Sequence, residues 1–421
     1  MTRKMKDSGI EWIGEIPEEW KTIKFNALYD LRNQKVSDRD FPPLSVTKNG
    51  IVPQLSSAAK TNDGDNRKLV KVGDFAINSR SDRRGSCGIS KYEGSVSLIN
   101  TVLRPINNEM SPDYYNLLFH TFEFADEFYK WGHGIVDDLW TTNWQDMKNI
   151  TLVYPSKKEQ DRIASVLNKK VKQINQTSKT IQQEIDALEE YRKSLITETV
   201  TKGLDKTVPM KDSGIEWIGE IPENWKVEKL KYLVETRESK ILLSDVQYNY
   251  IGLENIEKNI GKYISTDSTY ENQYYNFCEK GDILYSKLRP NLSKAIIAPF
   301  AACCTGEFEV IKSTKLHKKY ILYYLLSNYV TDATSAAIYG TKMPRVSWNY
   351  VKNLRVVFPN QSEDQIKIVN YLDKKLTIID QIVRQKQQQL NHLDKYKQSI
   401  VYEYVTGKKQ VSEKEGVKNA Q

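Results

Sequence analysis

The sequence contains no long apolar segment. None of its runs approaches the roughly eighteen consecutive apolar residues that a membrane-spanning helix needs. The basic N-terminal residues are not followed by the continuous apolar core of a signal peptide. Hydrophobic residues make up 39% of the chain and charged residues 28%, a composition typical of folded, soluble proteins. We therefore expect a cytoplasmic protein that makes no contact with a membrane.

Cysteine and histidine are scarce, with four of each in 421 residues. The cysteines (Cys87, Cys278, Cys303 and Cys304) are too few and too scattered for a disulfide framework, and they lack the CxxC spacing of a zinc site. We expect buried thiols in a reducing compartment. The histidines show no metal-ligand spacing, so no metal site is predicted in this chain.

The sequence motifs of common enzymes are absent as well. There is no GxGxxG or GxxxxGKS/T phosphate cradle, no HExxH and no GxSxG. The segment DFPPL (40–44) has the residues of an adenine methyltransferase motif in the wrong order, which favours a proline-stiffened turn. Asp282 and Lys287 lack the second carboxylate of a nuclease centre, so we interpret them as a turn aspartate and a surface lysine. The chain is predicted to bind rather than to catalyse.

What the chain does contain is a long internal repeat. The phrase MKDSGIEWIGEIPEEWK (5–21) returns as MKDSGIEWIGEIPENWK (210–226), 205 residues later, and differs only at Glu19 and Asn224. Three further pairs of segments match at nearly the same offset: 143–155 with 347–359, 159–176 with 364–381, and 188–201 with 393–406. The interiors, 27–140 and 232–338, have diverged. This pattern indicates a tandem duplication of one domain plan.

The repeated phrase has no chemistry of its own, because its acids lack metal-ligand spacing. Its apolar residues, Ile10, Trp12, Ile13, Ile16 and Trp20, suit burial, and its glycines and proline suit turns. We predict that each copy docks the start of its domain into a socket. Contact with a partner is the alternative.

Each half ends in a segment with heptad spacing, which predicts a coiled coil. The seam residues are Leu167, Ile174, Ile181, Leu188 and Leu195 in the first half and Leu372, Ile379, Leu393 and Ile400 in the second. Polar residues interrupt the seams at Ser178, Arg192, Lys386 and Lys397. Dimerisation is the simpler interpretation. Two such helices in one chain favour an intramolecular, antiparallel pair that acts as a spacer.

Basic residues gather at matching places in the two halves. The net charge of +8 is compatible with nucleic acid without requiring it. In each half a Gly-Asp turn and a strand precede a basic stretch, and GIVDDLWTTNW (134–144) corresponds to AIYGTKMPRVSW (337–348). Such loops suit DNA, because cations neutralise phosphates and arginine pairs with guanine edges; a solvated basic face is the alternative. The candidate DNA-binding residues are Arg80, Arg83, Arg84, Lys91, Trp140, Lys287, Arg289, Lys294, Tyr339, Lys342 and Arg345.

From about residue 5 to residue 407 the chain resembles the specificity subunit of a type I restriction–modification system. The resemblance rests on the duplicated SGIEWIGEIPExW phrase, the GDFAINS and GDILYSKLRP segments, and the aromatic-Pro strands followed by EQDRIASVL and DQIKIVNYL. It implies two target-recognition domains that each read half of a bipartite, asymmetric DNA sequence. It also implies that the helices set the unread gap and dock two modification subunits, with the seam residues at these interfaces.

The resemblance places the chemistry in partner subunits. The modification subunits would bind S-adenosylmethionine and methylate adenine, and two restriction subunits would add cleavage driven by ATP and Mg. The specificity subunit itself would have no catalytic residue, cofactor or metal. The alternatives are a coiled-coil adaptor whose globular ends bind proteins, and a stand-alone DNA enzyme with an unfamiliar site.

The predicted fold class is α+β, with two mixed α/β recognition domains and two long helices in an antiparallel coiled coil with pseudo-twofold symmetry. The predicted boundaries are recognition domains at 5–158 and 204–363, helices at 159–203 and 364–407, and a polar tail at 408–421.

Overall fold

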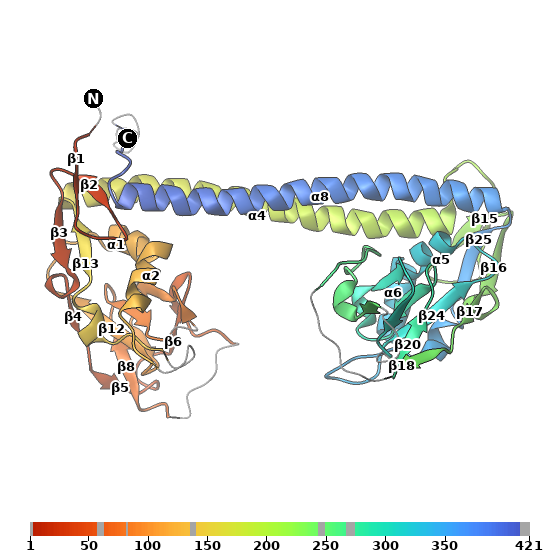
Figure 1. The fold of residues 1–421 in the computed structure, drawn as a ribbon, viewed down its shortest axis with the longest axis horizontal. Helices are drawn as coiled ribbons and strands as arrows, with labels where there is room; N and C mark the ends of the chain where they lie inside the picture. Colours follow the sequence, from red (N-terminus) through yellow and green to blue (C-terminus); the bar gives the residue numbers. More distant parts are fainter. Residues whose placement is uncertain are drawn as a thin grey trace. The chain divides into compact units, whose positions relative to one another are not determined.

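The computed structural model describes residues 3–56, 63–80, 83–134, 140–242, 249–266 and 274–412 (Figure 1). The chain divides into two compact units: residues 1–180 with 389–421, and residues 181–388. Each unit therefore contains one half of α4 (Lys157–Lys202) and one half of α8 (Ser362–Val405). No helix within the described ranges is long and apolar enough to cross a membrane.

The globular part of the first unit consists of antiparallel strands and short helices. The strands are β1 (Met5–Asp7), β2 (Glu15–Pro17), β3 (Lys21–Lys24), β4 (Tyr29–Leu31), β5 (Lys35–Val36), β6 (Leu44–Thr47), β7 (Gly50–Pro53), β8 (Arg67–Val70), β9 (Phe75–Asn78), β10 (Cys87–Ile89), β11 (Gly94–Val96), β12 (Asn100–Pro105) and β13 (Thr151–Tyr154). The helices are η1 (Phe25–Ala27), α1 (Pro112–Phe119), α2 (Phe122–Lys130) and α3 (Trp144–Met147). The largest sheet has the order β10-β9-β12-β4, and a second has the order β11-β8-β5.

The second unit repeats this plan. Its strands are β14 (Met210–Asp212), β15 (Glu220–Pro222), β16 (Trp225–Lys229), β17 (Val234–Thr236), β18 (Lys240–Leu242), β19 (Asn249–Ile251), β20 (Tyr274–Cys278), β21 (Ile283–Ser286), β22 (Ala295–Ile297), β23 (Ala302–Cys304), β24 (Phe308–Ser313) and β25 (Arg355–Pro359). Its helices are η4 (Leu230–Tyr232), η6 (Leu253–Asn255), η7 (Pro290–Leu292), α5 (Lys318–Leu325), α6 (Asn328–Ala336) and α7 (Trp348–Val351). One sheet has the order β17-β24-β21-β22, and another, β18-β20-β23-β19, includes one parallel pair.

The main sheets of the two units share one topology. In the first unit β9 follows a Gly-Asp turn and lies between β10 and β12, with the short β4 beyond β12. In the second unit β21 follows a Gly-Asp turn and lies between β22 and β24, with the short β17 beyond β24. The turn glycines, Gly73 and Gly281, have φ values of +88° and +97°, a conformation that glycine adopts without strain. The following aspartate is buried and accepts a hydrogen bond from an arginine, at 2.9 Å from Arg32 to Asp74 and 2.7 Å from Arg237 to Asp282. The predicted fold class is confirmed, and Asp282 is a structural turn residue.

The long helices share a core with the globular part of each unit. In the first unit the Tyr114 hydroxyl donates to the Val405 carbonyl of α8 at 2.6 Å. In the second, the Tyr320 hydroxyl donates to the Val200 carbonyl of α4 at 2.9 Å. Both tyrosines are fully buried, so these bonds also satisfy hydroxyls that water cannot reach.

Within each unit α4 and α8 are antiparallel, because the N-terminal half of one packs with the C-terminal half of the other. The observed helix ends lie within two residues of the predicted ones, 159–203 and 364–407. Of the predicted seam residues, Leu167, Ile174, Leu195, Leu372, Ile379 and Ile400 are buried, and Ile181, Leu188 and Leu393 are half-buried.

Charged residues on the seam are paired across the helices of the second unit. Arg192 of α4 donates to Asp380 of α8, and their side chains are only 4% and 12% exposed. The Nζ of Lys262 also contacts Asp380. Lys386 Nζ lies 2.6 Å from Glu184 Oε2. Because buried ions need partners, the Arg192–Asp380 pair favours one register of the two helices.

The repeated phrase forms a hairpin, β1–β2 or β14–β15, at the end of a long helix. In the first unit the Tyr402 hydroxyl of α8 donates to the Trp12 carbonyl at 2.8 Å. Gly407 follows α8 with φ +77°, and a Cβ there would lie 2.4 Å from Pro17 Cδ. In the second unit Gly203 follows α4 with φ +76°, and a Cβ there would lie 3.1 Å from the Trp225 ring. The socket that receives each phrase is thus the C-terminal end of a helix.

Candidate nucleic-acid interface

In the first unit the candidate basic residues lie where β9 ends. Arg80 pairs with Thr141, and Thr141 pairs with His133, so the chain after β9 lies beside the segment between α2 and α3. The Tyr129 hydroxyl of α2 donates to the Arg80 carbonyl at 2.9 Å. Arg80 and Arg83 are exposed. Of the predicted segment 134–144, residues 135–139 lie outside the described residues.

The second unit has the same arrangement where β21 ends. Leu288 and Tyr339 both pair with Arg345, which joins the loop after β21 to the segment between α6 and α7. Arg289 is exposed and has φ +50°, which is uncommon for a side chain larger than glycine. Lys342 is exposed as well. In both units, therefore, the loop after β9 or β21 lies beside the segment that precedes α3 or α7.

Several candidate cations already have an acidic partner. Arg84 pairs with Asp126 and its guanidinium lies 5.2 Å from the Phe122 ring centre. Lys287 Nζ lies 3.2 Å from Glu309 Oε2. Arg345 Nη2 lies 2.6 Å from Glu307 Oε1, and this carboxylate raises the pKa of Arg345. These pairs hold the loops in place.

Other candidates lie apart from the loops or are packed into the protein. Lys91 follows β10, at the opposite end of the β9–β10 hairpin from Arg80, so the structure does not bring it to the cluster. Lys294 is at the correct end but donates to the Leu253 carbonyl at 2.6 Å, and burial lowers its pKa. The Trp140 indole donates to the Tyr129 carbonyl at 2.8 Å, which gives it a structural contact.

A hollow of about 370 Å³ lies at the second cluster, lined by Lys287, Glu307, Tyr339, Arg345 and Trp348 among others. Tyr339 is 58% exposed there. The Trp348 indole donates to Thr236 Oγ1 at 3.2 Å. Sequence reasoning missed Glu307 and Trp348. The alignment of NWQDMKN with SWNYVKN contained a signal for Trp348, because it pairs Trp144 with Trp348.

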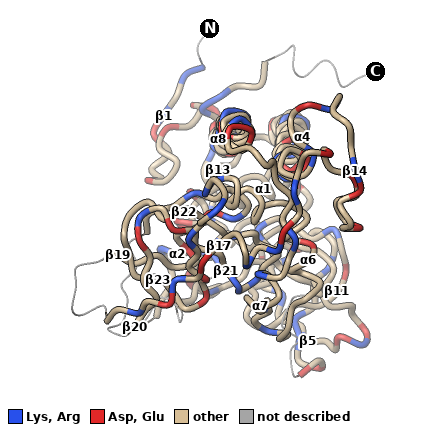
Figure 2. Tube along the Cα trace, turned by 90° about the vertical axis from the view of Figure 1, so that its right-hand side faces the viewer, with Lys and Arg blue, Asp and Glu red and all other residues tan. Residues whose placement is uncertain are grey.

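The charges of the two units are mixed rather than segregated. Figure 2 shows lysine and arginine in blue beside aspartate and glutamate in red on the traces of both α4 and α8. Throughout the described parts of the chain, no group of three or more histidine, cysteine, aspartate or glutamate residues is arranged to hold a metal ion. The four cysteines are buried and unbridged, and burial raises the pKa of Cys87 to about 12.

Sequence comparison now identifies the class of protein. The type I restriction modification DNA specificity domain matches the chain twice, at residues 17–187 and 222–392. The chain therefore belongs to the type I restriction–modification DNA specificity family, and its role is that of a DNA-recognition subunit. No match supports the alternative of a structural adaptor.

Relatives of the same class match over most of their length. The MjaVIII specificity subunit of Methanocaldococcus jannaschii is 24% identical over 93% of both chains. The EcoDI specificity subunit of Escherichia coli is 24% identical over 92% of this chain and 88% of its own.

Solved structures share the fold. A chain from a study of assembly and conformational transition of a type I restriction–modification system has a TM-score of 0.69 at 12% identity, covering 93% of this chain and 98% of its own. The HsdS subunit of Thermoanaerobacter tengcongensis has a TM-score of 0.50 at 15% identity, with the same coverage.

Proposed function

We propose that the two loop clusters at the ends of β9 and β21 are the DNA-reading surfaces of this subunit. One observation carries the proposal: the same strand order presents both clusters, but the residues presented differ. The first cluster exposes Arg80 and Arg83, whereas the second exposes Arg289 and Lys342. A shared scaffold with different side chains predicts two different half-sites, and hence a bipartite, asymmetric target.

The candidate cations divide into two roles. Arg80, Arg83, Arg289 and Lys342 are exposed and suited to reach phosphates or base edges. Arg84, Lys287 and Arg345 are paired with carboxylates and position the loops. Lys91, Trp140 and Lys294 remain candidates, but their surroundings favour other roles.

The helices set the distance between half-sites and dock two modification subunits. The six buried seam residues serve the helix pair and the domain cores, which leaves the half-buried Ile181, Leu188 and Leu393 and the exposed positions beside the seam for partners. Tyr191 and Tyr396 are 53% and 51% exposed and are related by the 205-residue repeat. Each unit therefore offers an equivalent exposed aromatic residue for one modification subunit.

Catalysis belongs to the partners in this proposal. The modification subunits supply S-adenosylmethionine-dependent adenine methylation, and two restriction subunits supply cleavage driven by ATP and Mg. We place the assembly in the cytoplasm, where its DNA substrate lies.

A methylome tests the proposal. The chain is expressed with its modification subunit in a host that lacks adenine methylation, and methylated adenines are mapped across the genome. A bipartite motif is expected. Exchanging residues 27–140 for those of a relative should change one half of the motif only. A methylome without a bipartite motif, or one in which both halves change together, refutes the proposal.

A single-residue comparison tests the reading surface. Arg289→Ala should weaken DNA binding by the assembled complex and lower the salt dependence by about one unit of slope if the contact is to phosphate. Lys312→Ala is the matched control, because Lys312 is an exposed cation toward the opposite end of β24 from the cluster. Equal affinities for the two variants, measured by fluorescence anisotropy over a range of salt, would remove Arg289 from the interface.

A further inference from the structure

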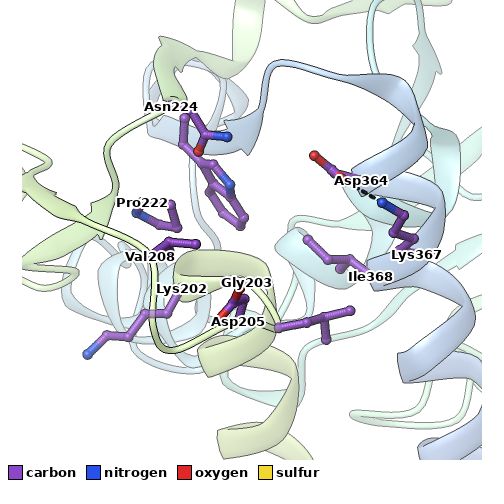
Figure 3. A pocket seen from close by; sticks show the side chains of 11 residues that line it. Lys202, Gly203, Asp205, Val208, Pro222, Asn224, Asp364, Lys367 and Ile368 are labelled. Carbon is purple, nitrogen blue, oxygen red and sulfur yellow. Dashed lines mark hydrogen bonds and ion pairs between the residues drawn. The ribbon is translucent and has the colours of Figure 1, made fainter.

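A pocket of about 300 Å³ lies at the C-terminal end of α4 within the second unit. Val208 and Asn224 lie on one side of this pocket, and Asp364 and Lys367 of α8 lie on the other (Figure 3). The Trp225 side chain also lines it. Val208 precedes the second copy of the repeated phrase, Asn224 and Trp225 belong to it, and Asp364 and Lys367 lie in the first turns of α8.

The equivalent place in the first unit holds an arginine, Arg3, beside a hollow of about 250 Å³ that Glu159 and Arg162 also line. Arg3 Nε donates to Glu19 Oε1 at 2.7 Å, and Arg3 Nη2 donates to Glu159 Oε1 at 2.6 Å. The guanidinium lies 5.4 Å from the centre of the Trp20 ring. The Trp20 indole donates to the other oxygen of Glu159 at 2.9 Å. The Arg3 side chain is only 14% exposed, so the site is built around it.

The 205-residue repeat relates the two places residue by residue. Trp225 corresponds to Trp20 and Asp364 to Glu159, so the aromatic ring and one carboxylate are retained. Val208 stands where the first unit has Arg3, and Asn224 stands where it has Glu19. The one difference between the two 17-residue phrases therefore lies at this pocket.

The retained carboxylate is available to a new partner. Asp364 pairs with Lys367 at 2.9 Å, three residues along the same helix, and both side chains are substantially exposed at 36% and 69%. Exposed pairs of this kind are weak and readily exchanged. The oxygens that hold Arg3 in the first unit thus have a counterpart in the second, whereas the guanidinium does not.

We propose that this pocket receives an arginine side chain from a protein partner. The guanidinium lies against Trp225 and donates to Asp364, as Arg3 does with Trp20 and Glu159. Arginine fits better than lysine, because its planar group stacks on an aromatic ring and donates to a carboxylate at the same time. Asn224 adds an amide oxygen as an uncharged acceptor.

Titration with N-acetylarginine amide tests the pocket in the isolated chain. NMR signals of the tryptophan indoles report binding, and N-acetyllysine amide is the comparison. One indole signal should shift in a saturable manner with the arginine compound and less with the lysine compound. Asp364→Asn should weaken binding about tenfold, the loss of one charge-assisted hydrogen bond. The absence of a saturable shift in the unaltered chain would refute the proposal.

Two double variants use the repeat as an internal control. Val208→Arg with Asn224→Glu, the filled-pocket variant, recreates the first unit's arrangement, places the chain's own guanidinium against Trp225 and Asp364, and should abolish binding. Arg3→Val with Glu19→Asn recreates the second unit's arrangement and should add another arginine site. If the filled-pocket variant binds as the unaltered chain does, the compound binds elsewhere and the proposal is wrong.

The identity of the partner rests on the proposed function, and a second experiment tests it. The filled-pocket variant should assemble with the modification subunit at least about tenfold more weakly than the unaltered chain. Equal assembly of the two would refute this partner role. Failure of the unaltered chain to assemble would instead contradict the proposed function, while the titration would still decide whether the arginine site exists.

Discussion

The stability of the second unit is predicted to depend strongly on Asp380. It accepts hydrogen bonds from Arg192 across the helix pair and from Lys262 of the globular part. The Arg192 side chain is 4% exposed, and its Nε has no hydrogen-bond partner among the described residues. Asp380→Ala would therefore leave a buried guanidinium without its counterion.

The expected loss of unfolding free energy follows from the burial of Arg192. Removing one partner of a buried ion pair costs about 3–5 kcal/mol. Lys262 is 50% exposed and regains water, so its lost pairing adds at most about 1 kcal/mol. We expect the free energy of unfolding of the second unit to fall by about 4 kcal/mol, which is roughly a thousandfold in the open population.

Hydrogen exchange followed by mass spectrometry measures this loss locally. Peptides from residues 362–388 should exchange faster in Asp380→Ala, whereas those from 389–405 serve as an internal reference. Glu198→Ala is the matched control, because the Glu198–Lys206 pair lies in the same unit with side chains 50% and 81% exposed, and we expect a loss below about 1 kcal/mol.

A double variant separates charge from packing. Arg192→Met with Asp380→Leu removes both ions and should recover stability to within about 1 kcal/mol of the unaltered chain. If Asp380→Ala alone stays within about 1 kcal/mol of the unaltered chain, the reasoning from the buried pair is wrong.

Three further predictions concern other parts of the chain. Gly407→Ala should destabilise the first unit by at least about 1–2 kcal/mol in thermal unfolding, because the residue has positive φ and its Cβ would meet Pro17; a neutral result would contradict the packing of the phrase. Burial lowers the pKa of His120 below its ordinary 6.5, so the unfolded chain binds a proton more readily and stability should fall as pH drops below 6.5. His120→Gln should flatten that pH dependence of the unfolding free energy, and an unchanged slope would exclude His120 as its source. Tyr396→Ala should weaken assembly with the modification subunit without changing the methylated motif, and an altered motif would argue against this role.

The sequence predicted the repeat, the two long helices and the matching loops correctly. These features depend on patterns along the sequence: a phrase repeated at an offset of 205 residues, a seven-residue apolar spacing and Gly-Asp turns before strands. Each pattern is visible in the sequence itself, without knowledge of which distant residues are in contact.

The sequence did not predict which cations are paired. Arg289 and Arg345 look equivalent in the sequence, yet Arg345 meets Glu307, which lies 38 residues away. Likewise, Lys91 lies near Arg84 along the chain but at the other end of a hairpin. Such pairings depend on strand register, which a basic stretch alone does not specify.

The repeated phrase illustrates both what the sequence predicts and what it does not predict. Its isoleucine anchors and its last tryptophan are buried in both copies, as their apolar character predicted, but Trp12 is half-buried and its equivalent Trp217 is 76% exposed. Only the tertiary structure decided what it is buried against: the end of α8 in the first unit and the end of α4 in the second. The difference between Glu19 and Asn224 also gained meaning only there, because the partner of Glu19 is Arg3, 16 residues earlier in the chain. Local composition determines burial, whereas contacts between distant segments determine pairing.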